Sequence, residues 1–546
     1  MYEYLEHIFA EALKSCGIDA RDLAFEVPKN HEHGDASTNI AMLRARDLKK
    51  APKSIAQLII DALRFDTALV ASVEIAGAGF INVRYTSAYL SGRVESILAH
   101  GTEYGRNTTG AGKGANVEYV SANPTGPLHP GHGRNIMLGE AISTLLQWSG
   151  YSVTREYYFN NGGNQMNNLA RSVYARYRQA LGEESFPFDE ENGYKGGYIR
   201  DIAEGMVREF GDSLRDENEE NLATCRKRGE AWCFASIRKT LETLGIRHDV
   251  FFNENTLYED GEISKTITAL KDRGLAYDRD GATWIATSRL GLENDRVIVK
   301  STGEPTYRLP DMAYHKIKVD RGDDLVIDIF GADHISTVQE VIAGVRALGG
   351  DASKIKVVLH QMVSFLKDGQ PYKLSKRNGE QITLDDLIAE LSADVVRYFF
   401  LMRSADTQLV FDMNLAMEQS DKNPVFYLQY AHARVCSLFQ NAAAQGVVPG
   451  VSGSSCMVEH VTERELVKTC DKFPSVVKRA AQAMEPHVVA DYLREVAAAF
   501  HAFYHECRIL GESEQVRDSR LRLAMMARIV LHNGLTVLGV STPEKM

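Results

Sequence analysis

The chain has 546 residues, of which 44% are hydrophobic and 25% charged, and its formal net charge is −11. This length exceeds what a single hydrophobic core supports, so three or four domains are expected. The negative net charge excludes a protein coated with nucleic-acid-binding surface, although a local basic stripe can still bind RNA. Composition alone therefore leaves the function open.

Cysteine usage and hydropathy indicate a cytoplasmic protein. No apolar run approaches the roughly 20 residues that a membrane span needs. The first residues, MYEYLEHIFAEAL, predict an amphipathic helix with acidic residues and lack the basic start of a signal peptide. Seven cysteines without a C-x-x-C pair favour reduced thiols over disulfides or a zinc site, so no metal ligands are expected.

Residues 1–108 are expected to form a first unit of helices and strands. Helical patterns at 2–16 and 52–64 flank a turn-rich stretch, and residues 73–85 alternate apolar and polar side chains as a strand does. Between them lies a basic helix, LRARDLKK. This helix is either a solvated face or a contact for RNA, and the pattern favours neither.

A β-α-β unit opens the next segment. A strand over residues 116–121 leads into a helix over 131–148 with an apolar face, and a second strand follows at 151–159. This order predicts a doubly wound parallel sheet whose ligands bind beyond the carboxyl ends of the strands. Residues 160–300 are more polar and predict an insertion. Further strands are expected at 326–330 and 356–360.

From about residue 416 the pattern is helical. Asn423 and Pro424 are a typical N-cap and first-turn pair. Apolar residues recur at helical spacing from Val489 to Leu510, and Gly511 is expected to end that helix. Residues 441–455 predict a flexible surface loop. The pattern therefore predicts a helical bundle.

The most informative stretch joins the first strand of the sheet to its helix. His129 and His132 stand where the helix begins, after a turn rich in Pro and Gly. Backbone N–H groups and the helix dipole favour an anion there, and two imidazoles suit a phosphate that gains charge in a transition state. The alternative is that the histidines only cap the helix. The motif consists of Ala122, Asn123, Pro124, Thr125, Gly126, Pro127, Leu128, His129, Pro130, Gly131 and His132.

A second motif, KLSKR, lies far downstream in a loop framed by Gly369 and Gly379. Its alternative interpretation is an exposed basic loop. The ordered pair HxGH and KLSKR resembles the HIGH and KMSKS signatures of class I aminoacyl-tRNA synthetases. The surrounding stretches VEYVSANPTGPLHPGHGRN, TYRLPDMAYH, GADHISTVQE and YKLSKRNGEQITLDDLI resemble the arginyl-tRNA synthetases, and the likeness runs along the whole chain.

The resemblance implies an α/β class I synthetase nucleotide-binding domain (Rossmann-like, HUP) at residues 109–415, with a connective insertion at about 160–300. It implies an N-terminal α+β domain at 1–108 that meets the elbow of tRNA, and an all-α anticodon-binding bundle at 416–546. The implied activity is ATP-dependent attachment of L-arginine to tRNA(Arg) through an arginyl-adenylate, with Mg²⁺ accompanying ATP. Members of the family generally need bound tRNA before they activate arginine, and a monomer is expected.

The resemblance also implies roles for single residues. The implied catalytic groups are His129, His132, Lys373 and Lys376, where the two lysines would neutralise the departing phosphates. The implied ATP site comprises these four with Pro130, Gly131, Asp333, His334 and Ser375. The implied arginine site comprises Glu118, Ser121, Asn123, His132, Tyr307 and Asp311, with a carboxylate that takes the guanidinium in a two-bond geometry. The chain departs from the family at Thr337, near the place where a further histidine is often found.

Two other hypotheses explain less of the sequence. A class I synthetase for another amino acid, such as cysteine, would require a zinc–thiolate site, which this cysteine spacing does not supply. A catalytically silent tRNA-binding relative should have lost the histidines or lysines of the two motifs, and this chain keeps them.

Overall fold

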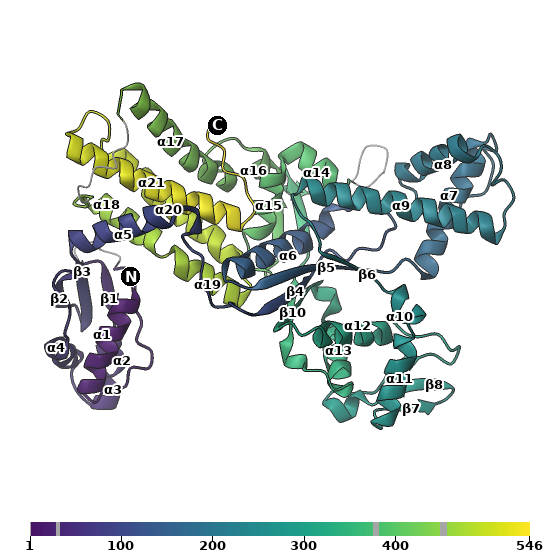
Figure 1. Cartoon of the computed structure of the whole chain (residues 1–546), viewed down its shortest axis with the longest axis horizontal. Helices are drawn as coiled ribbons and strands as arrows, with labels where there is room; N and C mark the ends of the chain where they lie inside the picture. The colour runs from purple at the N-terminus through teal and green to yellow at the C-terminus, as the bar shows by residue number, and fades with distance from the viewer. Residues whose placement is uncertain (1, 29–32, 375–381, 448–455) are drawn as a thin grey trace.

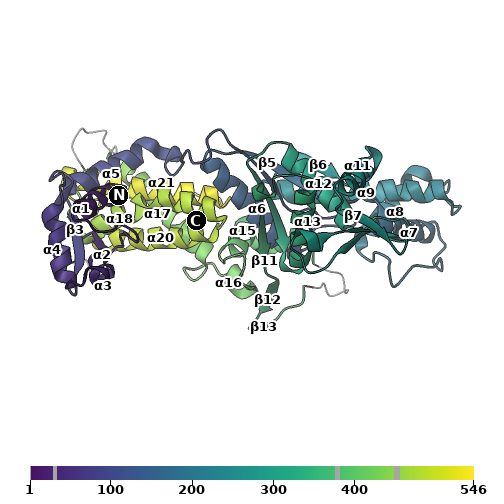
Figure 2. The same ribbon diagram turned by 90° about the horizontal axis from the view of Figure 1, so that it is seen from below.

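A computed structural model describes residues 2–28, 33–374, 382–447 and 456–546. The molecule is elongated around a central sheet, with the N-terminal unit and the C-terminal helices towards one end (Figures 1 and 2). Within these four ranges, no helix is both long enough and apolar enough to cross a membrane.

Five parallel strands form the central sheet, in the order β11-β10-β4-β5-β6. The chain crosses from one half of the sheet to the other beside β4, and ligands of such sheets bind at this point, beyond the strand carboxyl ends. The doubly wound parallel sheet predicted from the sequence is confirmed. Its strands are β4 (Gly114–Glu118), β5 (Ser152–Phe159), β6 (Val250–Asn253), β10 (Leu325–Gly331) and β11 (Ile355–His360).

Strand β6 is a correction to the sequence analysis, because it lies inside the segment expected to be an insertion. Its four residues are too few to show a strand period between two long polar stretches. Three helices precede it and bury a hydrophobic cluster of their own. These are α7 (Gly163–Ala180), α8 (Gly197–Phe210) and α9 (Glu219–Thr243). The elements after β6 are α10 (Asn255–Glu259), α11 (Glu262–Asp272) and a small antiparallel sheet of β7 (Ala276–Arg279), β8 (Ala282–Ile285) and β9 (Arg296–Val299).

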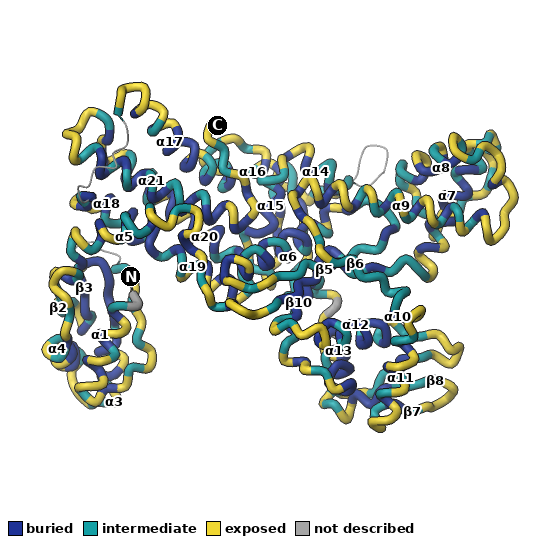
Figure 3. The backbone as a smooth tube through the Cα atoms, in the orientation of Figure 1, coloured by how far each residue is buried: buried dark blue, intermediate teal, exposed yellow. Residues whose placement is uncertain are grey.

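Helices cover both faces of the central sheet (Figures 1 and 2). On one face lies α6 (Pro130–Trp148), which is buried along most of its length (Figure 3). Helix α6 closely approaches the residue that follows β4, because Gly139 lies directly against the ring of Tyr119. On the other face lie α12 (Arg308–Asp320) and α13 (Ile335–Ala347), which pack on each other.

The chain leaves the sheet through a short three-stranded sheet and a set of small helices. The KLSKR motif begins just after β13, and its last three residues, 375–377, lie outside the described ranges. The elements of this region are β12 (Val363–Lys367), β13 (Gln370–Pro371), α14 (Leu384–Leu391), α15 (Ala393–Leu401), β14 (Leu409–Asp412) and α16 (Met413–Met417).

The N-terminal unit contains a hairpin where the sequence analysis expects one strand over residues 73–85. Gly77 and Gly79 both have positive φ, which lets the chain turn back between β2 and β3. Arg44 of the basic stretch is buried and donates to two backbone carbonyls, so it is not available to RNA. The elements are α1 (Tyr2–Ser15), β1 (Ala36–Thr38), α2 (Ile40–Leu43), α3 (Ala45–Leu48), α4 (Pro52–Ala62), β2 (Val70–Ala76), β3 (Phe80–Tyr85) and α5 (Ser87–His100).

The C-terminal helices form the expected bundle. The Asn423 side chain caps the first of them by accepting from the Val425 N–H, as predicted. Two limits differ from the expectation: α17 continues into the predicted loop, and α20 ends before Gly511 because Cys507 is already extended. The helices are α17 (Pro424–Ala444), α18 (Val461–Asp471), α19 (Phe473–Ala483), α20 (His487–Glu506) and α21 (Glu514–Val537).

Buried ion pairs attach the N-terminal unit to this bundle. Helix α5 packs on α18 and α21. Asp35 accepts from Arg464 at 2.6 Å and lies 3.2 Å from the Lys468 ammonium. Arg93 donates to Asp471 at 2.5 Å. Removing one partner of such a pair leaves an uncompensated buried charge, so these contacts fix how the two units are oriented.

The contact between α6 and β4 generates a stability prediction. A Cβ added at Gly139 would lie 2.1 Å from Cγ of Tyr119, so Gly139→Ala should lower the free energy of unfolding by about 1–3 kcal/mol. Gly92 is the matched control, because it is exposed in α5 with nothing within 4 Å of its added Cβ. Gly92→Ala should raise stability by about 0.5–1 kcal/mol. Urea unfolding followed by circular dichroism measures both, and equal stability of the two variants would contradict the packing described.

Candidate active site

The turn that leaves β4 has an unusual backbone. Val120 and Ser121 both have positive φ, 68° and 43°, although neither is a glycine. For a β-branched residue such as valine this conformation is strained. Asn135 of α6 holds the turn, because its side chain accepts from the Val120 N–H at 2.6 Å and donates to the Ile329 carbonyl at 2.6 Å. The strained turn therefore ties β4, α6 and β10 together where the motif begins.

The two motif histidines cap α6, as the alternative interpretation requires. Nδ1 of His129 accepts from the Gly131 N–H at 3.0 Å, and Nδ1 of His132 accepts from the His129 N–H at 3.2 Å. Their ring centroids lie 3.9 Å apart. Burial lowers the pKa of His129, and burial together with His129 lowers the pKa of His132 to about 4. Both rings are therefore neutral near pH 7, with Nδ1 as acceptor and Nε2–H as a donor that remains for a ligand.

An inner cavity of about 520 Å³ opens beside these histidines, at the carboxyl ends of β4 and β10. It brings together four residues of the predicted arginine site: Glu118, Ser121, His132 and Asp311. One end of the cavity is polar, with Tyr158 and His315 beside the carboxylates. The other end is lined by apolar residues of α13 and β11, among them Val338, Ile342, Val357 and, beyond β11, Met362.

A row of three carboxylates crosses the sheet at the polar end. In the strand register Glu118 of β4 is opposite both Asp328 of β10 and Glu156 of β5. All three are buried. Like charges directly opposite one another destabilise a sheet, so this row needs nearby cations.

Helix α12 and its C-cap supply these cations at three-residue steps: His315, Lys318 and Arg321. The Lys318 ammonium donates to Glu118 at 2.7 Å and also to Asp328. Arg321 donates to Glu156 at 2.5 Å. Although burial alone would raise the pKa of Asp328, Lys318 and His315 hold it below its usual range.

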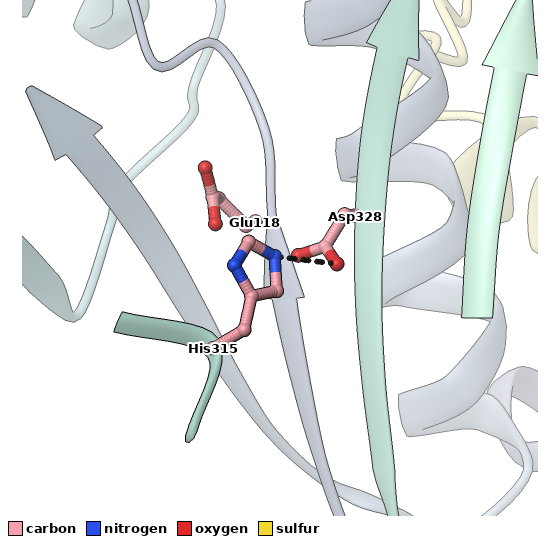
Figure 4. A group of neighbouring side chains, drawn as sticks. All are labelled: Glu118, His315 and Asp328. Carbon is pink, nitrogen blue, oxygen red and sulfur yellow. Dashed lines mark hydrogen bonds and ion pairs between the residues drawn. The ribbon is translucent and has the colours of Figure 1, made fainter. Parts of the chain in front are cut away.

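The His315 ring lies beside Glu118 and Asp328 (Figure 4). Its Nδ1 lies 2.8 Å from the backbone carbonyl of Asp311, and its Nε2 lies 3.2 Å from the Asp328 carboxylate. Both partners only accept, so both ring nitrogens must carry protons. This agrees with the pKa of His315, which Asp328 raises although burial alone would lower it.

Glu118, His315 and Asp328 also offer ligand atoms within 4.8 Å of one another, as a metal site would. Lys318 already bonds both carboxylates, however, and His315 is protonated on both nitrogens. A metal ion needs deprotonated ligands with free electron pairs. The cluster is therefore matched to its own lysine rather than to a metal.

Asp311 lines the cavity, and its carboxylate is not paired by this row of cations. In the described structure His315 donates to the backbone carbonyl of Asp311 and not to its carboxylate. Burial, with the nearby charges of Glu118 and Glu254, raises the pKa of Asp311 to about 7. A carboxylate held in this way gains most when a cationic ligand arrives.

Glu254, which follows β6, is a residue that the sequence analysis misses. It accepts from the Tyr158 hydroxyl at 2.6 Å and from the Asn160 side chain at 2.8 Å. An acidic residue just after a strand of a parallel sheet is the signal that could have found it. That signal depends on recognising β6, which the sequence pattern does not reveal.

An outer cavity of about 1,050 Å³ opens on the other side of the motif turn. Asn123 lies here and donates to Gln165 of α7 at 2.9 Å. The Tyr198 hydroxyl donates to the Thr125 carbonyl at 2.6 Å, and its ring stacks on Trp232. His129 and His132 line both cavities. Further residues that line the outer cavity are Tyr194, Lys195, Gly196, Asp201, Ile382 and Thr383.

The remaining predicted site residues have different positions. Tyr307 is the N-cap of α12 and 56% exposed; it is not among the described residues that line either cavity. Asp333 lines the inner cavity, as do Gly131 and Thr337. Lys373 is exposed. Ser375, Lys376 and the side chain of His334 lie outside what the structure describes.

Comparison with known proteins agrees with this architecture. Three family descriptions match consecutive parts of the chain: an arginyl-tRNA synthetase N-terminal domain at 3–85, a catalytic domain of class I tRNA synthetases (R) at 93–402, and a DALR anticodon-binding domain at 428–546.

Curated relatives match along the whole chain. An arginine–tRNA ligase of Salinibacter ruber is 44% identical over 100% of both chains. One of Desulfotalea psychrophila is 45% identical over 95% of this chain and 94% of its own. The arginyl-tRNA synthetase of Thermus thermophilus has the same fold, with a TM-score of 0.76 over 100% of both chains at 22% identity.

The chain thus combines a parallel sheet, paired histidines at the start of α6 and an acidic cavity beside them. The two curated relatives named above are 44% and 45% identical to it over 95% or more of its length. The matched descriptions place a catalytic domain between an N-terminal and an anticodon-binding domain. The chain belongs to the arginyl-tRNA synthetase family, the class I ligases that join arginine to tRNA.

Proposed function

We propose that arginine and ATP meet in the inner cavity and that the 3′ end of tRNA(Arg) enters through the outer one. The family uses ATP to attach arginine to tRNA. The observation that carries the proposal is that His129 and His132 line both cavities. An α-phosphate held by their Nε2–H groups can be reached from both sides.

Two successive displacements complete the reaction. The arginine carboxylate attacks the α-phosphate of ATP, which forms arginyl-adenylate and releases diphosphate. A ribose hydroxyl at the 3′ end of tRNA then attacks the carbonyl carbon, which releases AMP. The enzyme forms no covalent bond in either step, so its contribution is positioning and stabilisation of developing charge. The apolar end of the inner cavity suits the adenine ring, and the polar end suits arginine.

Arginine specificity is proposed to come from Asp311, with Glu254 behind Tyr158 as a second negative charge. A guanidinium can make two parallel bonds to a carboxylate, which an ammonium cannot. Lysine would therefore leave buried acceptors unpaired. Sites of this kind reject the wrong substrate by about 10⁴–10⁵ without editing. Glu118 and Ser121 line the same cavity and stay in the proposed arginine site. Asn123 and Tyr307 stay in it on the resemblance alone.

The remaining assignments rest on the family resemblance and on position. Lys373 and Lys376 are proposed to neutralise the β- and γ-phosphates and Ser375 to donate a hydroxyl hydrogen bond, with Mg²⁺ carried in on ATP. Asp333 and His334 are proposed to contact ATP.

The proposed domain limits are 1–108, 109–415 and 416–546, with the first at the tRNA elbow and the last at the anticodon. We also propose a monomer that acts in the cytoplasm, where seven unpaired cysteines are expected to stay reduced.

Charging of tRNA with each of the 20 amino acids tests the function. Only arginine should be attached, and only with ATP and tRNA(Arg) present. Attachment of another amino acid at a comparable kcat/KM would contradict the assignment of the inner cavity.

Loss of a motif histidine should slow adenylate formation. His129→Ala and His132→Ala each remove one donor to the transition state, so the rate of ATP–diphosphate exchange should fall by roughly 10²–10³. Affinity for tRNA should change little. His505→Ala is the matched control, because His505 is exposed on the surface. Near-normal exchange in either motif variant, with circular dichroism showing an intact fold, would show that these rings act only as helix caps.

The raised pKa of Asp311 predicts how arginine binding depends on pH. Only the ionised carboxylate pairs with a guanidinium. With a pKa of about 7, its ionised fraction rises from about one tenth at pH 6 to about nine tenths at pH 8. The KM for arginine should therefore fall by about tenfold across this range, while the KM for ATP stays level. Asp311→Asn should weaken arginine binding and remove the dependence.

The same shift predicts the sign of a stability effect. The folded, substrate-free protein keeps the Asp311 proton between pH 4 and 7, where the unfolded chain releases it. The contribution of Asp311 to stability should therefore fall as pH rises through this window. Thermal unfolding of the parent and of Asp311→Asn measures the difference. Two flat results together would exclude the assigned pKa. These are an arginine KM of the parent that is constant from pH 6 to 8, and a difference in unfolding temperature between the parent and Asp311→Asn that is constant from pH 4 to 7.

A further inference from the structure

The inner cavity has more carboxylates near it than one arginine can neutralise. Glu118 and Asp328 are buried on neighbouring strands, and Asp311 and Glu254 lie close by. The excess is met from within the protein, because Lys318 donates to both Glu118 and Asp328. Lys318 itself is fully buried and is not among the described residues that line the cavity.

We propose that Lys318 is a positioning residue for arginine: it holds Glu118 in one orientation at the cavity wall and, with His315, cancels the charges of Glu118 and Asp328. Asp311 is then available to pair with the substrate cation. This inference rests on the arginine site proposed above.

The contacts of Glu118 restrain both of its oxygens. Oε2 accepts from Lys318 at 2.7 Å, and Oε1 accepts from the Ser121 hydroxyl at 3.0 Å. The Ser121 oxygen in turn accepts from the Tyr158 N–H at 3.1 Å, so it is itself fixed. The Lys318 ammonium also lies 4.8 Å from the centre of the Tyr314 ring. The buried Lys318 ammonium thus restrains the orientation of the Glu118 carboxylate.

A purely structural role is the alternative, since Lys318 also attaches α12 to the sheet. The chain provides a control for this. Arg321 and Glu156 make the same kind of tie between α12 and the sheet, and neither lines the inner cavity in the described structure. A double variant at either pair removes one acid and one base, which avoids leaving an extra buried charge.

The experiment compares Lys318→Met/Asp328→Asn with Arg321→Met/Glu156→Gln. ATP–diphosphate exchange is measured with saturating tRNA(Arg), and the unfolding temperature is measured alongside. The Lys318 pair should raise the KM for arginine by about tenfold or more, with the KM for ATP within about twofold. The Arg321 pair should lower the unfolding temperature similarly but change the KM for arginine by less than about threefold.

Equal arginine KM values for the two double variants would overturn the proposal. If the Lys318 pair does not fold, Lys318→Gln/Asp328→Asn replaces it, because glutamine can still donate to Glu118. The expected rise in the arginine KM is then smaller but still above that of the Arg321 pair. Failure of both Lys318 variants to fold, while the Arg321 pair folds, would make Lys318 a structural residue and would also overturn it.

Glu118→Gln separates this inference from the site on which it rests. A raised arginine KM in Glu118→Gln with no change in the Lys318 pair would overturn the positioning role alone. An unchanged arginine KM in Glu118→Gln would overturn both, because Glu118 would then not belong to the arginine site.

Discussion

Three acids in a row across a parallel sheet are the constraint on which the rest of this active site depends. Glu156, Glu118 and Asp328 come into register because β5, β4 and β10 are neighbours. Such a row would repel itself, and its stability requires α12 to lie across it with its basic side chains facing the strands. These ion pairs therefore help to position α12, and with it Asp311 in the first turn of that helix.

This balance explains how a strongly acidic pocket can remain selective. If every carboxylate near the cavity were unpaired, any small cation would be attracted. The resident lysine and the doubly protonated histidine satisfy Glu118 and Asp328, and Asp311 keeps a raised pKa until a cation arrives. The negative charge of Asp311 is thus not cancelled by these two cations and can pair with a guanidinium. Desolvation then makes the remaining interaction strong, because few waters compete with it.

The phosphate chemistry has a different physical basis. The motif histidines are neutral and accept backbone N–H bonds through Nδ1, which leaves Nε2–H as the donor proposed for the phosphate. Neutral donors favour charge that develops in the transition state without binding the ground state excessively. The strained backbone at Val120 shapes this turn, and Asn135 holds it by bonds to the Val120 N–H and to the Ile329 carbonyl of β10.

The rest of the chain gives this site a firm frame for a long RNA. Helix α6 carries the histidines at one end and packs on α15 and α19 along its length. Buried Arg134 ties its first turn to the Gln361 and Ser404 carbonyls. The ion pairs between Asp35, Arg93 and the bundle then fix the N-terminal unit. Buried contacts thus set the spacing between the parts that are proposed to hold tRNA.

The sequence by itself determined the features that depend on neighbours along the chain. The alternation of strands and helices, the cap of α17 at Asn423 and the two histidines after a Pro- and Gly-rich turn follow from local backbone chemistry. The resemblance carried by the motifs added the family and the arginine site, of which Glu118, Ser121, His132 and Asp311 share one cavity. The spacing of Asp311, His315 and Lys318, four and three residues apart, also indicates that they share one face of a helix.

Only the tertiary structure decided what that face meets. Strand register places Glu118 opposite Asp328, 210 positions later in the chain, and no local pattern specifies such a pairing. The four residues of β6 become a strand because β5 offers an edge, and Glu254 is positioned with them. The two glycines that turn β2 into β3 follow the same logic, since pairing of the hairpin selects the turn. Local chemistry selects the elements, whereas burial and register, which join residues far apart in the chain, select their partners.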